Sequence, residues 1–190
     1  MPFTSNEHQS STFTNLEHRW NSVRNNDLIN LAMHMIPVLL KADRCSLFLI
    51  QPETQDVWLE AGTGVQARQI TVDVQSSMVG ECILKGRTIR RDELNSRDGA
   101  HREIANEQNY SVMTALTVPI RPSDGVAVGA LQALNKQQGS FSERDEEQLE
   151  AIAALMLPSI RTMYENRDLV SRIRQLEREL ESLKTLKTPD

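Results

Sequence analysis

The sequence predicts an α+β fold, with a central antiparallel sheet of about six strands, helices packed on it, and long helices at both ends. Three observations support this prediction. Strand patterns gather in two groups, over residues 45–74 and 112–134. A long helical pattern precedes the first group, and another follows the second. Strands that do not alternate regularly with helices are typical of antiparallel sheets rather than of doubly wound parallel ones.

The composition excludes several classes of protein. The chain has 190 residues and a net charge of −5, which argues against nucleic acid or an anionic membrane as the main partner. No apolar run approaches the roughly 20 residues of a membrane span. The N-terminus lacks the basic start and apolar stretch of a secretory signal. Cys45 and Cys82 sit among apolar neighbours, which predicts two buried thiols in a reducing cytoplasm.

The first third of the chain predicts a tail, a helix and strands. Residues 1–13 are polar and rich in Ser and Thr, as in a disordered tail. Thr14 and Glu17 have capping-box spacing and open a long helix. Its apolar stripe exceeds the third of a helix that one domain surface needs, so it can serve a domain and a partner together. Strands are expected at residues 45–50 and 56–62 and, more weakly, at 68–74.

The rest of the chain predicts a short helix, a long polar loop, two strands and a second long helix. A short helix is expected at 76–86, stopped by Gly86, and strands are expected at 112–121 and 126–134. Residues 88–108 are polar and irregular, and a loop of this length inside a compact domain is usually functional. Ser142 and Asp145 cap a second long helix that reaches about Leu186, with a kink or break expected at Pro158.

The C-terminal part of that helix, residues 161–190, is predicted to be a coiled-coil arm. Its apolar residues repeat with 3.5-residue spacing, which keeps every side chain on the line that faces a partner helix. The charged pairs at flanking positions fit parallel and antiparallel pairing alike, whereas Asn166 favours the parallel pair. About three heptads alone would be weak, so the interface of a homodimer is expected to include the N-terminal helix. The alternative is an arm that packs back on its own domain. The interface residues expected are Trp20, Asn166, Leu169, Ile173, Leu176, Leu180 and Leu183.

The most specific motif lies between the last strand and the last helix. It reads N-K-x4-F-x3-D-E and consists of Asn135, Lys136, Phe141, Asp145 and Glu146. It resembles the NKFDE motif of GAF domains, in the form seen in cyclic-nucleotide phosphodiesterases and bacterial adenylate cyclases. The resemblance covers about residues 26–160 and includes the segments CSLFLI, SSMVGECILKGRTIRRDEL, TALTVPI and GALQALNK. It implies a GAF domain at residues 14–160, N-terminal helix included.

The motif itself is predicted to be structural. Lys136 at the end of the strand can reach Asp145 in the helix cap as an ion pair, which would be partly exposed and worth about 1 kcal/mol. In the family, too, this motif is understood to support the pocket rather than to touch the nucleotide.

The resemblance implies a ligand pocket between one face of the sheet and the loop after the third strand. Ser46 matches a serine that contacts cyclic nucleotides, Asp92 matches the aspartate of the lid segment, and Val112 is assigned to the same site. Glu60 and Ala61 align where a phosphodiesterase has purine-reading residues, and Gln132 stands where an acidic residue is often found. These departures leave three hypotheses open: a cyclic nucleotide, another small ligand, or no ligand. The ligand-binding residues expected are Ser46, Glu60, Ala61, Asp92, Val112 and Gln132.

Gln132 decides between two functions. It is one amide in an apolar strand, and a buried amide without partners costs about 1–3 kcal/mol, so it needs an internal partner or a ligand. An open cavity beside Gln132 and Ser46 would favour a small-molecule-sensing regulatory domain that acts in signal transduction as a cytoplasmic homodimer with an output domain or partner protein. A Gln132 bonded to its neighbours in a filled cavity would favour a ligand-free dimerisation or scaffolding module.

Catalysis is not expected. The four histidines are scattered without the spacing of metal ligands. Cys45 and Cys82 lack the spacing of the redox cysteines in the GAF-fold methionine sulfoxide reductases. We therefore predict that the chain is not an enzyme and holds no metal or cofactor.

Overall fold

The computed structural model describes residues 27–51, 54–64, 70–94, 111–123 and 125–186. Residues 28–157 form one compact unit, and a second unit contains Asp27 and helix α4 (Glu143–Leu186) from Pro158 onward. The predicted tail at 1–13, the helix start at Thr14 and the interface residue Trp20 lie outside the described residues.

The core is a six-stranded sheet in the order β3-β2-β1-β6-β5-β4. All neighbouring strands pair antiparallel, which confirms the predicted fold class. The long strands β1 and β6 form the centre, as the apolar sequences CSLFLI and GALQAL require of strands that are buried on both faces. The strands are β1 (Ala42–Ile50), β2 (Val57–Gly62), β3 (Thr71–Val72), β4 (Ile89–Arg91), β5 (Ala115–Ile120) and β6 (Gly129–Lys136).

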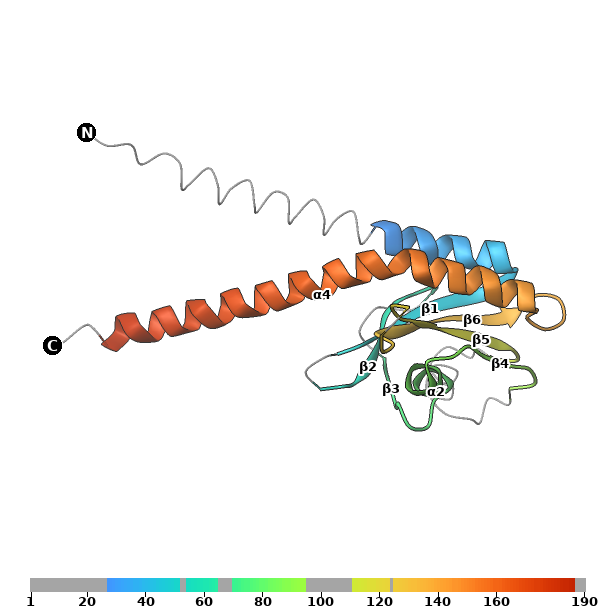
Figure 1. Ribbon diagram of the computed structural model, residues 1–190, viewed down its shortest axis with the longest axis horizontal. Helices are drawn as coiled ribbons and strands as arrows, with labels where there is room; N and C mark the ends of the chain where they lie inside the picture. The colour runs from blue at the N-terminus through green and yellow to red at the C-terminus, as the bar shows by residue number, and fades with distance from the viewer. Residues whose placement is uncertain (1–26, 52–53, 65–69, 95–110, 124, 187–190) are drawn as a thin grey trace, which may run out of the picture. The chain divides into compact units, whose positions relative to one another are not determined.

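Helices cover both faces of this sheet (Figure 1). The helix at 27–40 and the first part of α4 lie over one face, and α2 (Met78–Lys85) lies over the other. Side chains alternate along β1, so Leu47 and Leu49 face the first layer while Ser46 and Phe48 face α2. Phe48 accordingly belongs to a cluster that includes Val79 and Cys82 of α2.

Helix α2 ends as the sequence predicts and begins at Met78, two residues later than expected. The Ser77 side chain accepts a hydrogen bond from the backbone N–H of Gly80 at 2.9 Å, which caps the N-terminus. Gly86 follows the helix with φ 58°, a left-handed conformation that glycine adopts without strain, and its N–H donates to the carbonyl of Ile83. The stop signal at Gly86 is confirmed.

The helix at 27–40 is fastened through a carbonyl that Pro37 leaves unpaired within the helix. Proline has no N–H, so the carbonyl of Met33 lacks its usual partner four residues on. The Thr63 hydroxyl and the Cys45 thiol donate to this oxygen instead, at 3.2 and 3.1 Å. A proline inside the helix thus creates the attachment point for strand β1.

The same helix carries two apolar faces. One face is buried and consists of Ile29, Met33, Ile36 and Leu40. The other is exposed and consists of Leu28, Leu31, Met35, Val38 and Leu39, each about half exposed or more. The described part of the helix therefore has the wide stripe that the sequence predicts.

Several predicted bounds are corrected. Residues 89–91 form strand β4 instead of part of an irregular loop, because Ile89 and Arg91 pair with Thr117 and Ala115 of β5. The last strand runs to Lys136 rather than to Leu134, and the third is limited to Thr71–Val72. Helix α4 is not broken at Pro158, since losing one backbone hydrogen bond does not end a helix of 44 residues.

Candidate functional site

A row of buried polar side chains crosses the centre of the sheet on the face toward α2. Ser46 of β1 is paired with Gln132 of β6, and Gln132 is paired with Thr117 of β5. The exposed fractions of Ser46, Gln132 and Thr117 are 9%, 1% and 0%. We call Ser46, Gln132 and Thr117 the polar row. Three polar groups here are unusual, because a buried polar group costs free energy unless it is hydrogen-bonded.

Within the polar row, Gln132 has an internal partner. Its Nε2 donates to the Thr117 hydroxyl oxygen at 2.9 Å. The backbone carbonyl of Thr117 accepts a long contact of 3.6 Å from the Cys82 thiol of α2. The amide is therefore anchored by the neighbouring strand, which satisfies the first of the two conditions for a ligand-free module.

The other predicted ligand residues fall in different places. Val112 is buried beside Met78 and Leu134, close to the polar row along the same face. Asp92 is exposed and follows directly after β4. The structure thus brings Ser46, Gln132 and Val112 to one face, with Asp92 at the edge of the sheet.

Glu60 and Ala61 are not brought to the polar row. A β-bulge shifts the register between Leu47 and Phe48, so Ala61 pairs with Leu47 while Ser46 pairs with Gly62. Ala61 therefore lies on the sheet face opposite to Ser46. Together with Glu60 it lines a hollow of about 250 Å³ against the helix at 27–40, whose other lining residues are Asn30, Met33, His34, Gly62, Thr63 and Gly64.

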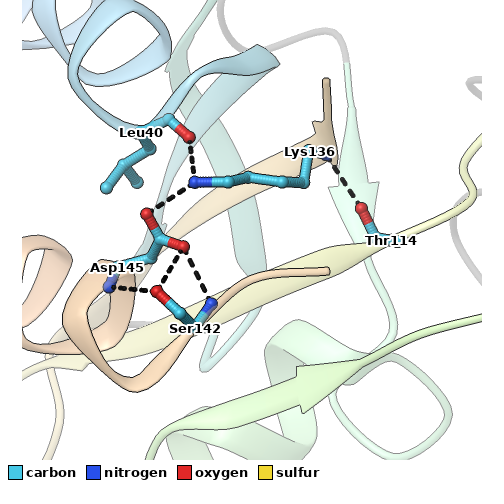
Figure 2. A network of polar contacts seen from close by, with 5 residues as sticks. All are labelled: Leu40, Thr114, Lys136, Ser142 and Asp145. Carbon is cyan, nitrogen blue, oxygen red and sulfur yellow. Dashed lines mark hydrogen bonds and ion pairs between the residues drawn. The ribbon is translucent and has the colours of Figure 1, made fainter. Parts of the chain in front are cut away.

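The motif residues join the last strand to both helices on the other face (Figure 2). The Lys136 ammonium donates to the carbonyl oxygen of Leu40 and to Oδ1 of Asp145, both at 2.7 Å. The Ser142 N–H and hydroxyl donate to Oδ2 of Asp145 at 2.8 Å, and the Asp145 N–H returns a bond to the Ser142 hydroxyl. The Lys136 N–H donates to the Thr114 hydroxyl at 2.8 Å. One lysine thus connects β6, the helix at 27–40 and α4.

The predicted ion pair is present, and it is more buried than expected. The side chains of Lys136 and Asp145 are 14% and 9% exposed, and the Phe141 ring lies 5.7 Å from the ammonium. Burial raises the pKa of Asp145, but hydrogen bonds from Lys136 and Ser142 outweigh it and hold the pKa below the ordinary value. Asp145 is therefore ionised at neutral pH.

Asn135 has a role that the sequence did not indicate. Its backbone is left-handed, with φ 54°, which asparagine tolerates better than most residues. Its side-chain oxygen accepts from the N–H groups of Met113 and Thr114, and its Nδ2 donates to the carbonyl of Ser111. The amide therefore adds to the backbone hydrogen bond from the Asn135 N–H to the Thr114 carbonyl and holds the segment that enters β5.

Two observations bear on metal binding and thiol chemistry in the part of the chain that the structure describes. That part contains no group of three or more side chains able to hold a metal ion. Cys45 bonds to the helix at 27–40 and Cys82 lies in α2, so the sheet separates the two thiols. None of the helices in the described ranges combines the length and apolar character needed to cross a membrane.

Comparison with known proteins identifies the family. Residues 25–157 match the family model described as the GAF domain. This chain belongs to the GAF domain family. GAF domains are regulatory sensing domains, and the motif residues, the six-stranded sheet and the polar row described above belong to this domain.

Two relatives and one solved structure illustrate the match. A protein named probable 3′,5′-cyclic phosphodiesterase pde-5, from Caenorhabditis elegans, is 24% identical over 133 residues, which cover 64% of this chain and 18% of that protein. The dual 3′,5′-cyclic-AMP and -GMP phosphodiesterase 11A of Takifugu rubripes is 29% identical over 126 residues, or 60% of this chain and 14% of that protein. The chain spans less than a fifth of the length of either. The GAF domain of a phosphoenolpyruvate-protein phosphotransferase from Coxiella burnetii shares the fold, with a TM-score of 0.63, 17% identity, and coverage of 80% of this chain and 98% of that one.

Proposed function

We propose that this GAF domain senses a small molecule as a homodimer in signal transduction, and that its ligand is a cyclic nucleotide. The polar row carries the proposal. Ser46, Gln132 and Thr117 place hydroxyl and amide groups at the centre of an otherwise apolar sheet face. A ligand with hydrogen-bonding edges, such as a purine, is the kind that a few polar groups on an apolar surface select.

The names of the relatives support a nucleotide ligand. The relatives above are named as cyclic phosphodiesterases, one of them for cyclic AMP and cyclic GMP. The hydrogen bond to Thr117 occupies one N–H of the Gln132 amide, which has two N–H groups and a carbonyl oxygen. Thr117 therefore fixes the orientation in which Gln132 would meet a base.

A thermal-shift titration with cyclic AMP and cyclic GMP tests this proposal. A ligand present at 100 times its dissociation constant stabilises the folded state by about 2.7 kcal/mol. We expect one of the two nucleotides to raise the melting temperature, and Gln132→Leu to abolish the rise. Gln138→Leu is the matched control, because Gln138 is exposed and outside the polar row. No shift with either nucleotide at millimolar concentration would refute the cyclic-nucleotide proposal.

A ligand-free scaffolding module is the second candidate, and the Gln132–Thr117 hydrogen bond favours it. If the two side chains only satisfy each other, replacing both by apolar residues of similar shape costs little. A Gln132→Leu/Thr117→Val variant with wild-type stability and unchanged output would support the scaffold. Loss of output in a stable double variant would support sensing.

The homodimer rests on the exposed seam of the arm. Leu169, Ile173, Leu176, Leu180 and Leu183 are 43–61% exposed, and exposed leucines at heptad spacing are typical of a helix that pairs with another. We expect sedimentation to report a dimer and Leu176→Asp to shift it toward monomer. Ser171→Asp, at an exposed position off the seam, should leave the dimer intact. A monomeric wild type at working concentration would refute this proposal.

The proposed function also implies a cellular location and a recipient of the signal. We propose a cytoplasmic setting, since both cysteines are free and buried. We further propose that α4 passes the signal to a partner protein or an attached domain. The chain spans less than a fifth of its relatives' length, which is consistent with this proposal. Ligand occupancy would then alter the pairing of two α4 helices.

A further inference from the structure

Strand β4 contacts a helix on each face of the sheet. Consecutive residues of a strand project to opposite faces, and here both arginines meet a carboxylate. Arg90 is 3.9 Å from Glu146 of α4, and Arg91 forms an ion pair with Glu81 of α2. The Thr88 hydroxyl, just before β4, donates to Glu150 of α4. This short strand therefore touches both the helix over the polar row and the helix that leads to the arm.

The contacts with α4 come from one helix face. Glu146 and Glu150 are four residues apart, so both point to the same side of α4. Thr88 and Arg90 are two residues apart and project to the same side of the sheet. Two residues in or beside β4 thus meet two matched positions on α4, and a displacement of the strand would act on both together.

The contacts with α2 are equally specific. Glu81 pairs with Arg91 across elements and with Lys85 within its own helix, at 2.7 Å. The hydrogen bond from Lys85 and the charge of Arg91 hold the pKa of Glu81 below its ordinary value, so the carboxylate is ionised at neutral pH. Ile89 packs against both apolar clusters beside α2. The side of β4 that faces α2 is therefore held by the Arg91–Glu81 ion pair and by the apolar packing of Ile89 beside the polar row.

The position of β4 suits it to movement. Within the described part of the chain, β4 is an edge strand that pairs with β5 alone. A charged contact at 3.9 Å is longer than the 2.7–2.9 Å of a direct charge-assisted hydrogen bond. A small shift of β4 would either close the Arg90–Glu146 contact to a direct bond or release it. The closed and released forms would be the two discrete arrangements that coupling between sites requires.

We propose that β4 is the mechanical link between the sheet face that carries the polar row and helix α4. The Arg91–Glu81 ion pair attaches β4 to α2. The Arg90–Glu146 and Thr88–Glu150 contacts attach it to α4. This inference rests on the proposed sensing function and names the route by which occupancy would reach α4. Arg90 and Arg91 are positioning residues in this scheme. The link itself exists without ligand, so it can be tested without one.

Hydrogen exchange measured by mass spectrometry on the ligand-free full chain tests the link. Glu81→Gln removes the α2 attachment, and we expect about fivefold faster amide exchange in α4 residues 143–157, on the opposite face of the sheet. Lys85→Gln is the matched control, because it removes the other partner of Glu81 and leaves β4 untouched. Its effect should stay within α2. Unchanged exchange in β1 reports that the whole domain has not been destabilised.

The reverse experiment starts from α4. Glu146→Gln/Glu150→Gln should raise exchange in α2, whereas Glu147→Gln, on the same helix turn and exposed, should not. If Glu81→Gln and the double variant change exchange only in their own helix and in β4, the proposed link is refuted.

Experiments with added cyclic AMP or cyclic GMP distinguish failure of the proposed link from failure of the proposed sensing function. A melting shift with no exchange change in α4 of the wild type refutes the link alone. If the variants change exchange in the helix on the opposite sheet face but neither nucleotide shifts the melting temperature, the cyclic-nucleotide proposal is refuted and the proposed link is supported. A working link predicts that the double variant retains the melting shift and loses the exchange change in α4.

Discussion

Replacing Lys136 by methionine tests how strongly β6 is fastened to its two helices. Methionine keeps an apolar chain of similar length and removes the ammonium, which donates to Leu40 and Asp145 at 2.7 Å. Removing one partner of a buried ion pair costs about 3–5 kcal/mol, whereas an exposed pair is worth about 0–1 kcal/mol. At 14% and 9% exposure the pair is closer to the buried case. We expect Lys136→Met to lower the free energy of unfolding by about 3 kcal/mol.

Urea unfolding followed by far-ultraviolet circular dichroism measures this loss. Lys85→Met is the matched variant, since it removes the same group from an exposed pair whose side chains are 48% and 27% accessible. It should cost less than about 1 kcal/mol. A double-mutant cycle of Lys136→Met with Asp145→Asn should give a coupling of about 1–3 kcal/mol, with an unchanged denaturant dependence.

Equal losses of unfolding free energy in Lys136→Met and Lys85→Met would refute the classification of the Lys136–Asp145 pair as buried. Equal costs would mean that water screens the Lys136 pair despite its burial. A large loss without coupling to Asp145 would assign the effect to the carbonyl of Leu40 instead.

Three further predictions concern stability. Because the folded-state pKa of Asp145 is lowered, its stabilisation is complete above the unfolded pKa of about 4 and is lost as pH falls through the folded pKa. The difference in unfolding free energy between wild type and Asp145→Asn should therefore be constant from about pH 8 to 6 and narrow below about pH 4; a gap that widens on acidification would contradict this. Thr117→Val should cost about 1–3 kcal/mol, because it removes the acceptor of the buried Gln132 amide, and adding Gln132→Leu should restore most of the loss in the same urea assay. Gly80→Ala should lower stability by about 1–3 kcal/mol although alanine usually favours helices, because its Cβ would lie 2.0 Å from the carbonyl oxygen of Val74; a melting temperature at or above wild type would show that α2 can move aside.

The elements predicted correctly from the sequence are those with a strong local signal. The stop at Gly86 depends on one residue that takes a left-handed backbone, and CSLFLI forms a strand because it is apolar on both faces. The Lys136–Asp145 pair was predictable because both residues flank a short connection between strand and helix. Its burial was not, since the carbonyl of Leu40 and the ring of Phe141 reach it only through tertiary packing.

The elements that were missed depend on pairing between distant residues. Strand β4 has three residues, two of them arginines, and it exists because β5 offers an edge. The placement of Glu60 and Ala61 depends on one extra residue in a β-bulge, which no local pattern indicates. Alignment with a motif cannot detect such a shift, because a one-residue change reverses the face to which each following side chain points.

The two cysteines have a practical consequence for experiments on this chain. Burial raises the pKa of Cys45 to about 11 and, with the nearby charges of Glu81 and Glu150, that of Cys82 to about 12. Alkylating reagents attack the thiolate, so both native thiols should stay unmodified at neutral pH. A single cysteine introduced at Ser171 of α4 would then accept a fluorophore or spin label selectively and, in the proposed homodimer, would report the distance between the two α4 helices without replacement of either native cysteine.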